Sequence, residues 1–139
     1  MKKMIIWLFV IGLIAAAGVY FYHFHIAAKH DDPLEADHMV TISAKDLYKM
    51  FSQYEDSANK LYNGKVIKVS GVVGTVELDK NRYTINYENG DEMGTVICEM
   101  DTVENETVKG IKPGNNATVA GFCNGINMDV YIDRCKLAN

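Results

Sequence analysis

The sequence predicts a mainly β fold: a five-stranded Greek-key barrel, preceded by an amphipathic helix and by an N-terminal transmembrane helix. Three observations predict it. An uncharged apolar run lies near the start of the chain, apolar residues then recur at three- and four-residue steps, and valine-rich segments separated by turn residues follow from residue 65. A chain of 139 residues has room for one such domain and an anchor.

The apolar run extends from Met4 to Tyr22, nineteen residues without a charge, and follows Lys2 and Lys3. As a helix it would span roughly 28 Å, close to the ~30 Å core of a bilayer. The alternative is a signal peptide cleaved at the alanines 15–17, but the run continues into aromatic residues that suit a membrane–water interface. The two lysines favour the cytoplasmic side, so we expect residues 30–139 outside the cytoplasm.

The anchor is assigned to residues 1–28, a stalk to residues 29–42, and the folded domain to residues 43–139. The stalk has no sustained periodicity, and Pro33 disfavours helix at the residue before it. All four histidines of the chain lie between residues 23 and 38. Their spacing does not bring them together on a rigid element, so we predict no metal site and no cofactor.

An amphipathic helix is predicted to open the folded domain. Ser43 and Asp46 approximate a capping box, and Asn63-Gly64 is a typical C-terminal stop. The apolar residues on one face of this helix are Leu47, Met50, Phe51, Tyr54, Ala58 and Leu61. We expect this face to pack on the barrel core.

Five strands are predicted from residue 65 onward. Gly71 and Gly74 interrupt the first, as in a long strand that coils, and Asn89-Gly90 predicts a hairpin turn after the second. Residues 102–110 have room for a short helix, and residues 124–129 are assigned to a loop. The predicted strands are Val66–Leu78, Arg82–Glu88, Thr95–Met100, Ala117–Cys123 and Val130–Leu137. Five strands with a helical insert after the third is the order of an OB-type barrel.

Five short segments of the chain resemble a known family. They are the segments Ala58–Val66 and Val69–Val73 near the start of the barrel, and Lys112–Gly114, Val119–Gly125 and Val130–Cys135 near its end. Together they resemble the tRNA_anti-like (OB-fold) family across residues 43–138. The resemblance implies an OB fold in a small, secreted or membrane-attached bacterial protein. These motifs are structural, so they imply a fold and not an activity.

Charge and composition argue against two classes of function, nucleic-acid binding and catalysis. Residues 1–29 carry Lys2, Lys3 and Lys29 and no acid, whereas the remaining 11 basic residues are outnumbered by all 18 acidic ones, a net charge of −7. Nucleic-acid-binding domains usually have a basic surface, so nucleic acid is not the expected partner. No histidine follows residue 38 and no catalytic set is visible, so we predict a protein that is not an enzyme.

The candidate ligand-binding residues lie where OB domains bind, on the second and third strands and the last hairpin. They are polar and aromatic side chains, although tyrosines in strands are also common in barrel cores. The candidates are Arg82, Tyr83, Tyr87, Asn124, Asn127 and Tyr131.

The cysteines Cys98, Cys123 and Cys135 are the remaining distinctive residues. Outside the cytoplasm a disulfide is expected, and the third and fifth strands of an OB barrel are neighbours, which favours a Cys98–Cys135 pair. A Cys123–Cys135 pair and three reduced, buried thiols remain alternatives.

The sequence therefore predicts a membrane-anchored, extracytoplasmic OB-fold binding module. Its expected partners are the membrane, through the N-terminal helix, and an envelope protein, a peptide or an oligosaccharide. The alternative is a nucleic-acid-binding OB-fold protein.

Overall fold

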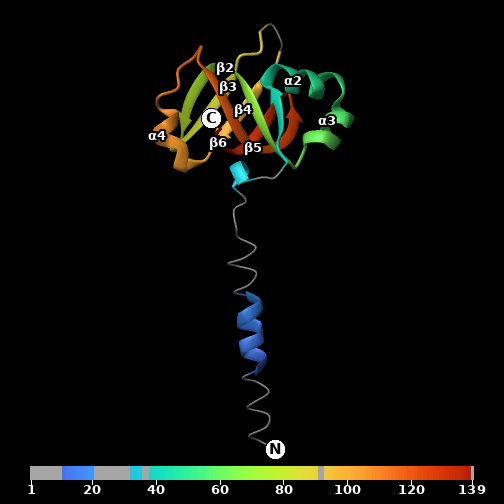
Figure 1. Ribbon diagram of the computed structural model, residues 1–139, viewed down its shortest axis with the longest axis vertical. Coiled ribbons are helices and arrows are strands. Elements are labelled where there is room, and N and C mark those ends of the chain that lie inside the picture. Colours follow the sequence, from blue (N-terminus) through green and yellow to red (C-terminus); the bar gives the residue numbers. More distant parts are fainter. Residues whose placement is uncertain (1–10, 21–31, 36–37, 91–92, 139) are drawn as a thin grey trace, which may run out of the picture. The chain divides into compact units, whose positions relative to one another are not determined.

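Figure 1 shows the computed structural model of the chain, which describes residues 11–20, 32–35, 38–90 and 93–138. The chain divides into two compact units, residues 1–31 and 32–139. In the first unit, residues 11–20 are helical. Within the described ranges, no helix has the length and apolar character needed to cross a bilayer. Residues 4–10, 21 and 22 of the predicted transmembrane helix lie outside the described residues.

The second unit is a closed β-barrel with helices at its periphery (Figure 1). Its strands follow the order β1-β2-β3-β4-β6-β5, and a β2–β5 pairing closes the barrel. The β4–β6 and β1–β2 pairs are parallel and the others are antiparallel. The elements are η1 (Pro33–Glu35), β1 (Val40–Ser43), α2 (Ala44–Gln53), α3 (Glu55–Tyr62), β2 (Val66–Asp79), β3 (Arg82–Tyr87), β4 (Val96–Met100), η2 (Thr102–Glu104), α4 (Asn105–Val108), β5 (Asn116–Asn127) and β6 (Asp129–Leu137). The predicted five-stranded barrel is confirmed, since β2 to β6 form it.

Part of the segment predicted as a stalk belongs to the folded unit. Pro33 is buried, and Lys136 Nζ on β6 lies 2.7 Å from Asp32 Oδ2. This ion pair lowers the pKa of Asp32 and raises that of Lys136. Strand β1 pairs in parallel with β2 from Val40↔Ile67 to Ser43↔Ser70. Four residues are too few for a clear alternating pattern, which is why the sequence did not indicate this strand.

The predicted helix is two helices that meet at Tyr54. Ser43 caps α2 as expected, because its hydroxyl accepts from the Asp46 N–H at 3.1 Å and donates to the Asp46 carboxylate at 2.7 Å. At Tyr54 the backbone leaves the helical region, with φ −137° and ψ 53°. The break turns the side chains of Tyr54 and Leu61 outward, at 60% and 49% exposure, and Tyr62 packs inward instead.

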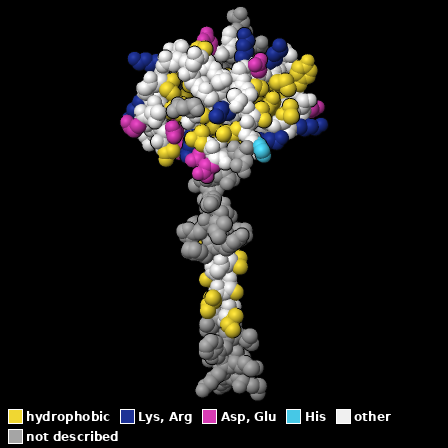
Figure 2. All heavy atoms as spheres, viewed as in Figure 1, with side chains coloured by type: hydrophobic (Ala, Val, Ile, Leu, Met, Phe, Trp, Pro, Cys, Tyr) yellow, Lys and Arg dark blue, Asp and Glu magenta, His cyan; other side chains and the backbone are white. Residues whose placement is uncertain are grey.

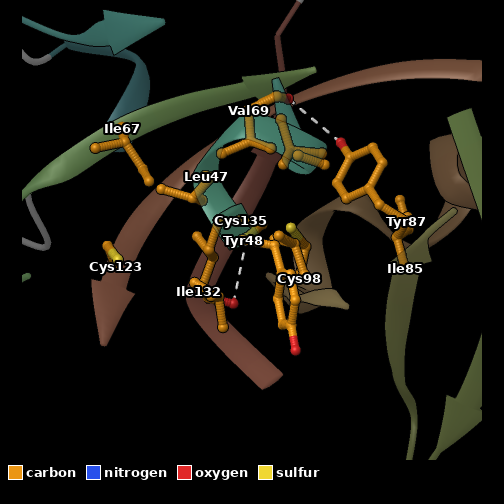
Figure 3. Packing of buried hydrophobic residues seen from close by; sticks show 14 of the residues in the cluster. Leu47, Tyr48, Ile67, Val69, Ile85, Tyr87, Cys98, Cys123, Ile132 and Cys135 are labelled. Atoms are coloured by element: carbon orange, nitrogen blue, oxygen red, sulfur yellow. Dashed lines mark hydrogen bonds between the residues drawn. The ribbon is translucent and has the colours of Figure 1, made fainter. Parts of the chain in front are cut away.

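The core lies inside the barrel and beneath α2. Leu47 and Phe51 on α2 are at most 1% exposed, and they pack with the inward-facing residues of the strands. Gly71 allows Tyr87 to approach, since a Cβ at Gly71 would lie 2.9 Å from the Tyr87 ring. The close-up of this cluster in Figure 3 shows α2 and strand residues meeting around the cysteines.

The β5–β6 connection is a tight turn and not the predicted six-residue loop. Strand β5 continues to Asn127 and β6 begins at Asp129, so Met128 alone joins them, with φ +71°. A bulge in β5 lies between the pairs Cys123↔Ile132 and Ile126↔Val130. A loop over residues 124–129 would have placed Cys123 opposite Val130, whereas the register places it opposite Ile132, two residues further along β6.

Candidate ligand-binding face

One row of uncharged side chains crosses the outside of the barrel. The strand register aligns Thr75 with Asn86, Asn86 with Ile97, and Ile97 with Tyr131. Asn124 lies in the β5 bulge that faces Tyr131 and is exposed. The neighbouring strand residues point into the core, so this row faces outward. We call Thr75, Asn86, Ile97, Tyr131 and Asn124 the neutral row.

The neutral row combines an aromatic ring with hydrogen-bonding groups. Tyr131 is 43% exposed, beside the partly buried Ile97. The Asn86 amide donates to Thr75 Oγ1 at 2.8 Å, while Asn86 Oδ1 is buried and accepts no hydrogen bond from the described residues.

A second row runs beside the first and carries charges. The register aligns Glu77 with Thr84 and Thr84 with Glu99, and Asp133 on β6 follows Ile132, the partner of Cys98. Arg82 Nη1 donates to Glu99 Oε1, and this hydrogen bond raises the pKa of Arg82. We call Glu77, Thr84, Glu99 and Asp133, with Arg82, the charged row.

Both arginines near the charged row are engaged by other side chains. Arg82 pairs with Glu99. The Arg134 guanidinium lies 4.0 Å from the centroid of the Phe122 ring, and its Nε is 3.8 Å from Asp133 Oδ2. A phosphate would have to compete with these carboxylates for the guanidinium groups. Figure 2 shows basic and acidic side chains scattered over the visible surface of the folded unit, without a basic patch.

A cavity of about 300 Å³ lies at the β2–β3 end of the face. The turn that forms this end has positive φ at Lys80 and Asn81, 46° and 68°, which is the geometry of a type I′ hairpin. The lining residues are Asp79, Lys80, Arg82, Thr84 and Glu99. The lining residues carry both positive and negative charges. The cavity can therefore contact polar or zwitterionic groups, but it does not select ligands of one charge.

The structure separates the predicted ligand-binding residues. Arg82, Asn124 and Tyr131 lie on the outer face, and Asn127 is exposed at the β5–β6 turn. Tyr83 is partly buried and packs against the core. The residues of this face that the sequence analysis missed are Thr75, Glu77, Thr84, Asn86, Ile97, Glu99 and Asp133. The alternation along β3 could have indicated Thr84 and Asn86.

Tyr87 is a core residue, which corrects its assignment as a ligand contact. Its side chain is 2% exposed, and its single hydroxyl hydrogen is shared between two carbonyl acceptors, Val69 O at 3.3 Å and Ala117 O at 3.1 Å. Burial raises the pKa of this hydroxyl, which keeps it protonated as a donor. Tyr83, Ile85 and Tyr87 alternate along β3 and share the inner face of this strand.

The three cysteines lie in the core as free thiols. Cys98 and Cys135 come from the neighbouring strands β4 and β6, while Cys123 comes from β5. Burial raises the pKa of both Cys123 and Cys135. Within the described parts of the chain, no three histidine, cysteine or acidic side chains are grouped so that they could hold a metal ion.

The fold and this face define an OB-type domain. The chain matches the model of the tRNA_anti-like family over residues 1–137 and belongs to that family. The comparison with curated proteins finds no match.

Solved structures of low sequence identity share the fold. A lipoprotein from Klebsiella pneumoniae, provisionally designated nucleic acid-binding, superposes with a TM-score of 0.60 at 16% identity, over 73% of this chain and 92% of that one. The S. pombe Stn1–Ten1 complex gives 0.43 at 14% identity, over 53% and 58% of the two chains. RecG bound to a three-way DNA junction gives 0.45 at 14%, over 74% and 13%. The similarity to the Klebsiella lipoprotein shows the fold alone. The other two superpositions have TM-scores below 0.5 and carry no argument.

Proposed function

We propose that this protein is a membrane-anchored binding module whose OB domain lies outside the cytoplasm and holds its partner on the neutral row. The observation that carries the proposal is the alignment of Asn86, Ile97 and Tyr131 across β3, β4 and β6. This is the region where OB domains bind their ligands. An exposed aromatic ring beside amide groups suits an oligosaccharide, a peptide or a segment of an envelope protein.

Binding is favoured over catalysis by the residue types of the folded domain. No histidine follows residue 38, so the commonest general base is missing from the barrel sequence. The acidic residues of the face are half-exposed, and Glu99 is already paired with Arg82. These side chains can contact a ligand, but they do not form a set that would activate one.

Nucleic-acid binding is the second candidate, and the designation of the Klebsiella lipoprotein favours it. The charge of the chain opposes it, because residues 30–139 carry 11 basic and 18 acidic residues. Single-stranded nucleic acid is usually held by a basic groove with several stacking aromatics. The neutral row has one aromatic residue, Tyr131, and the two nearby arginines are engaged by carboxylates.

A photo-crosslinking residue in place of Tyr131 tests the face in the cell. We expect a discrete crosslinked species from position 131 of the full-length chain, because this side chain is exposed on the neutral row. The same residue in place of Tyr54 is the matched control, since Tyr54 is 60% exposed on another part of the surface. Electrophoresis of the irradiated cells followed by mass spectrometry of the adduct provides the readout.

Three results are informative. An adduct at position 131 that resists nuclease supports the proposal. An adduct that nuclease removes, together with binding to single-stranded oligonucleotides that weakens steeply with added salt, would establish the second candidate instead. Adducts at position 54 and none at position 131 would reject the neutral row as the binding face.

Localisation is tested separately. A reporter enzyme that is active only outside the cytoplasm, fused after Asn139, is expected to be active, and the full-length chain should remain in the membrane fraction. The reason is the uncharged run from Met4 to Tyr22 after two lysines. A soluble product that begins near Gly18 would show cleavage of a signal peptide, and an inactive reporter would contradict the outward location.

A further inference from the structure

Two of the buried thiols meet in the barrel core. Strands β4 and β6 are parallel neighbours, and their register aligns Cys98 with Ile132 and Met100 with Cys135. The register shifts between these two pairs, and burial, followed by the nearby Cys98 thiol, raises the pKa of Cys135. Figure 3 shows the side chains of Cys98 and Cys135 close together, with the Cys135 thiol donating to Ile132 O at 3.5 Å.

The third thiol is placed differently. Cys123 on β5 is aligned with Ile132, and the β5 residue beside Cys135 is Gly121, where an added Cβ would lie 2.7 Å from Cys135 Sγ. Cys123 is two residues further along β5. In Figure 3, Cys123 lies apart from the other two cysteines. Its backbone is also fixed by hydrogen bonds with Lys65 O and Gly64 N. This strand therefore has little freedom to bring Cys123 toward Cys135.

We infer that Cys98 and Cys135 form a disulfide when the chain folds in oxidising surroundings, and that Cys123 remains a thiol. The inference rests on the proposed location outside the cytoplasm for its occurrence in the cell, but the pairing itself rests on the adjacency of β4 and β6 and on the nearness of the two side chains in the core. Because β4 and β6 carry Ile97 and Tyr131 on their outer side, the bond would also fix the spacing of the two strands at the centre of the neutral row.

The reaction is a thiol–disulfide exchange with an external disulfide as oxidant, such as oxidised glutathione. The thiolate of one cysteine attacks a sulfur of the oxidant and releases one thiol, which leaves a mixed disulfide. The second cysteine then attacks the protein sulfur of this mixed disulfide and releases the second thiol of the oxidant. Two S–H bonds of the protein are replaced by one S–S bond, and the oxidant takes up the two protons and two electrons.

Burial of the two cysteines determines at which stage of folding this reaction can occur. Cys98 and Cys135 are both 0% exposed, so an external disulfide cannot reach either sulfur in the closed barrel. Burial also disfavours the Cys135 thiolate, which is the reacting form. The bond must therefore form before the barrel closes, and the folded protein then shields both the bond and any unreacted thiols.

Refolding of the full-length chain in detergent tests the pairing. The reduced, denatured chain is refolded with a mixture of reduced and oxidised glutathione, or with reductant alone. We expect the oxidised product to contain one intramolecular disulfide, a Cys98–Cys135 linked peptide after non-reducing digestion, and a melting temperature ~10–20 °C above that of the reduced product. Cys98→Ala and Cys135→Ala should lose this difference between the two conditions.

Cys123→Ala is the matched control, because it removes an equally buried thiol and should keep the full difference. For each variant, the melting temperature after oxidative refolding is compared with that after refolding in reductant. This comparison separates the stabilisation by the disulfide from the cost of the substitution. Three alkylatable thiols after oxidative refolding, or a linked peptide that contains Cys123, would overturn the inference. Rapid formation of the disulfide in protein that has already folded in reductant would contradict the inference that the bond forms before the barrel closes.

Trapping of thiols in intact cells separates this inference from the proposed location. If the refolded protein forms the Cys98–Cys135 bond but the chain in cells has three thiols, the outward location is rejected and the pairing stands. If both samples contain the bond, the location and the pairing are supported together.

Discussion

Phe51→Ala is expected to lower the free energy of unfolding by about 3–5 kcal/mol. Phe51 is 1% exposed on α2, and its ring lies 6.2 Å from that of Tyr62 on α3, centroid to centroid, at an angle of 49°. Removing the ring takes away apolar contacts and leaves a cavity between the helices and the barrel. Equilibrium denaturation of the full-length chain, followed by circular dichroism, measures the loss.

Tyr54→Ala is the control for this prediction, because Tyr54 lies three residues away and is 60% exposed. Its replacement should change the free energy of unfolding by no more than ~0.5 kcal/mol. The contrast is informative since sequence periodicity places both side chains on one face. Equal losses in the two variants would show that the helix is not broken at Tyr54 and that both rings are buried.

Gly121→Ala is expected to destabilise the barrel by about 1–3 kcal/mol. A Cβ at this position would lie 2.7 Å from Cys135 Sγ, 2.7 Å from Ile132 Cγ2 and 2.9 Å from the backbone oxygen of Asp133. The first two atoms belong to side chains that are fully packed, and the third is backbone, so β5 and β6 would have to separate. Chemical denaturation again provides the measurement.

The matched control is Gly110→Ala, where the nearest atom to an added Cβ is Thr107 O at 3.6 Å. This substitution should leave the stability unchanged or raise it by ~0.4–1 kcal/mol, because alanine restricts the unfolded chain more than glycine does. A Gly121 variant as stable as the Gly110 variant would mean that the two strands are not in close contact at Gly121.

The strands of the barrel were predictable because their residues alternate between core and solvent. Alternation shows which residues share a face, but it does not show which face is inside. Tyrosine fits either side, and Tyr87 is buried because two backbone oxygens, Val69 O and Ala117 O, lie within reach of its hydroxyl. Those oxygens belong to β2 and β5, so their positions depend on barrel closure and not on the local sequence.

The helix break and strand β1 also depend on tertiary structure. Tyr54 has no sequence feature that ends a helix, and the residues on both sides of it form helices. The interruption allows Phe51 and Tyr62 to pack on the same core. Three members of the neutral row, Thr75, Asn86 and Ile97, were missed for a related reason, since the row consists of single residues from four strands and the β5 bulge. Only the register aligns Thr75, Asn86, Ile97 and Tyr131.

The pairing of β2 with three other strands affects how the chain folds during synthesis. The second half of β2 pairs with β3 in a local hairpin, but the first half pairs with β5, from Val66↔Phe122 to Val72↔Asn116. At ~5–20 residues per second, the ribosome completes β5 only seconds after β2. During that interval one valine-rich edge of β2 has no partner strand, and such edges pair with other chains. We expect closure of this edge to limit the rate of folding, and the nascent chain to be most prone to aggregation just before β5 emerges.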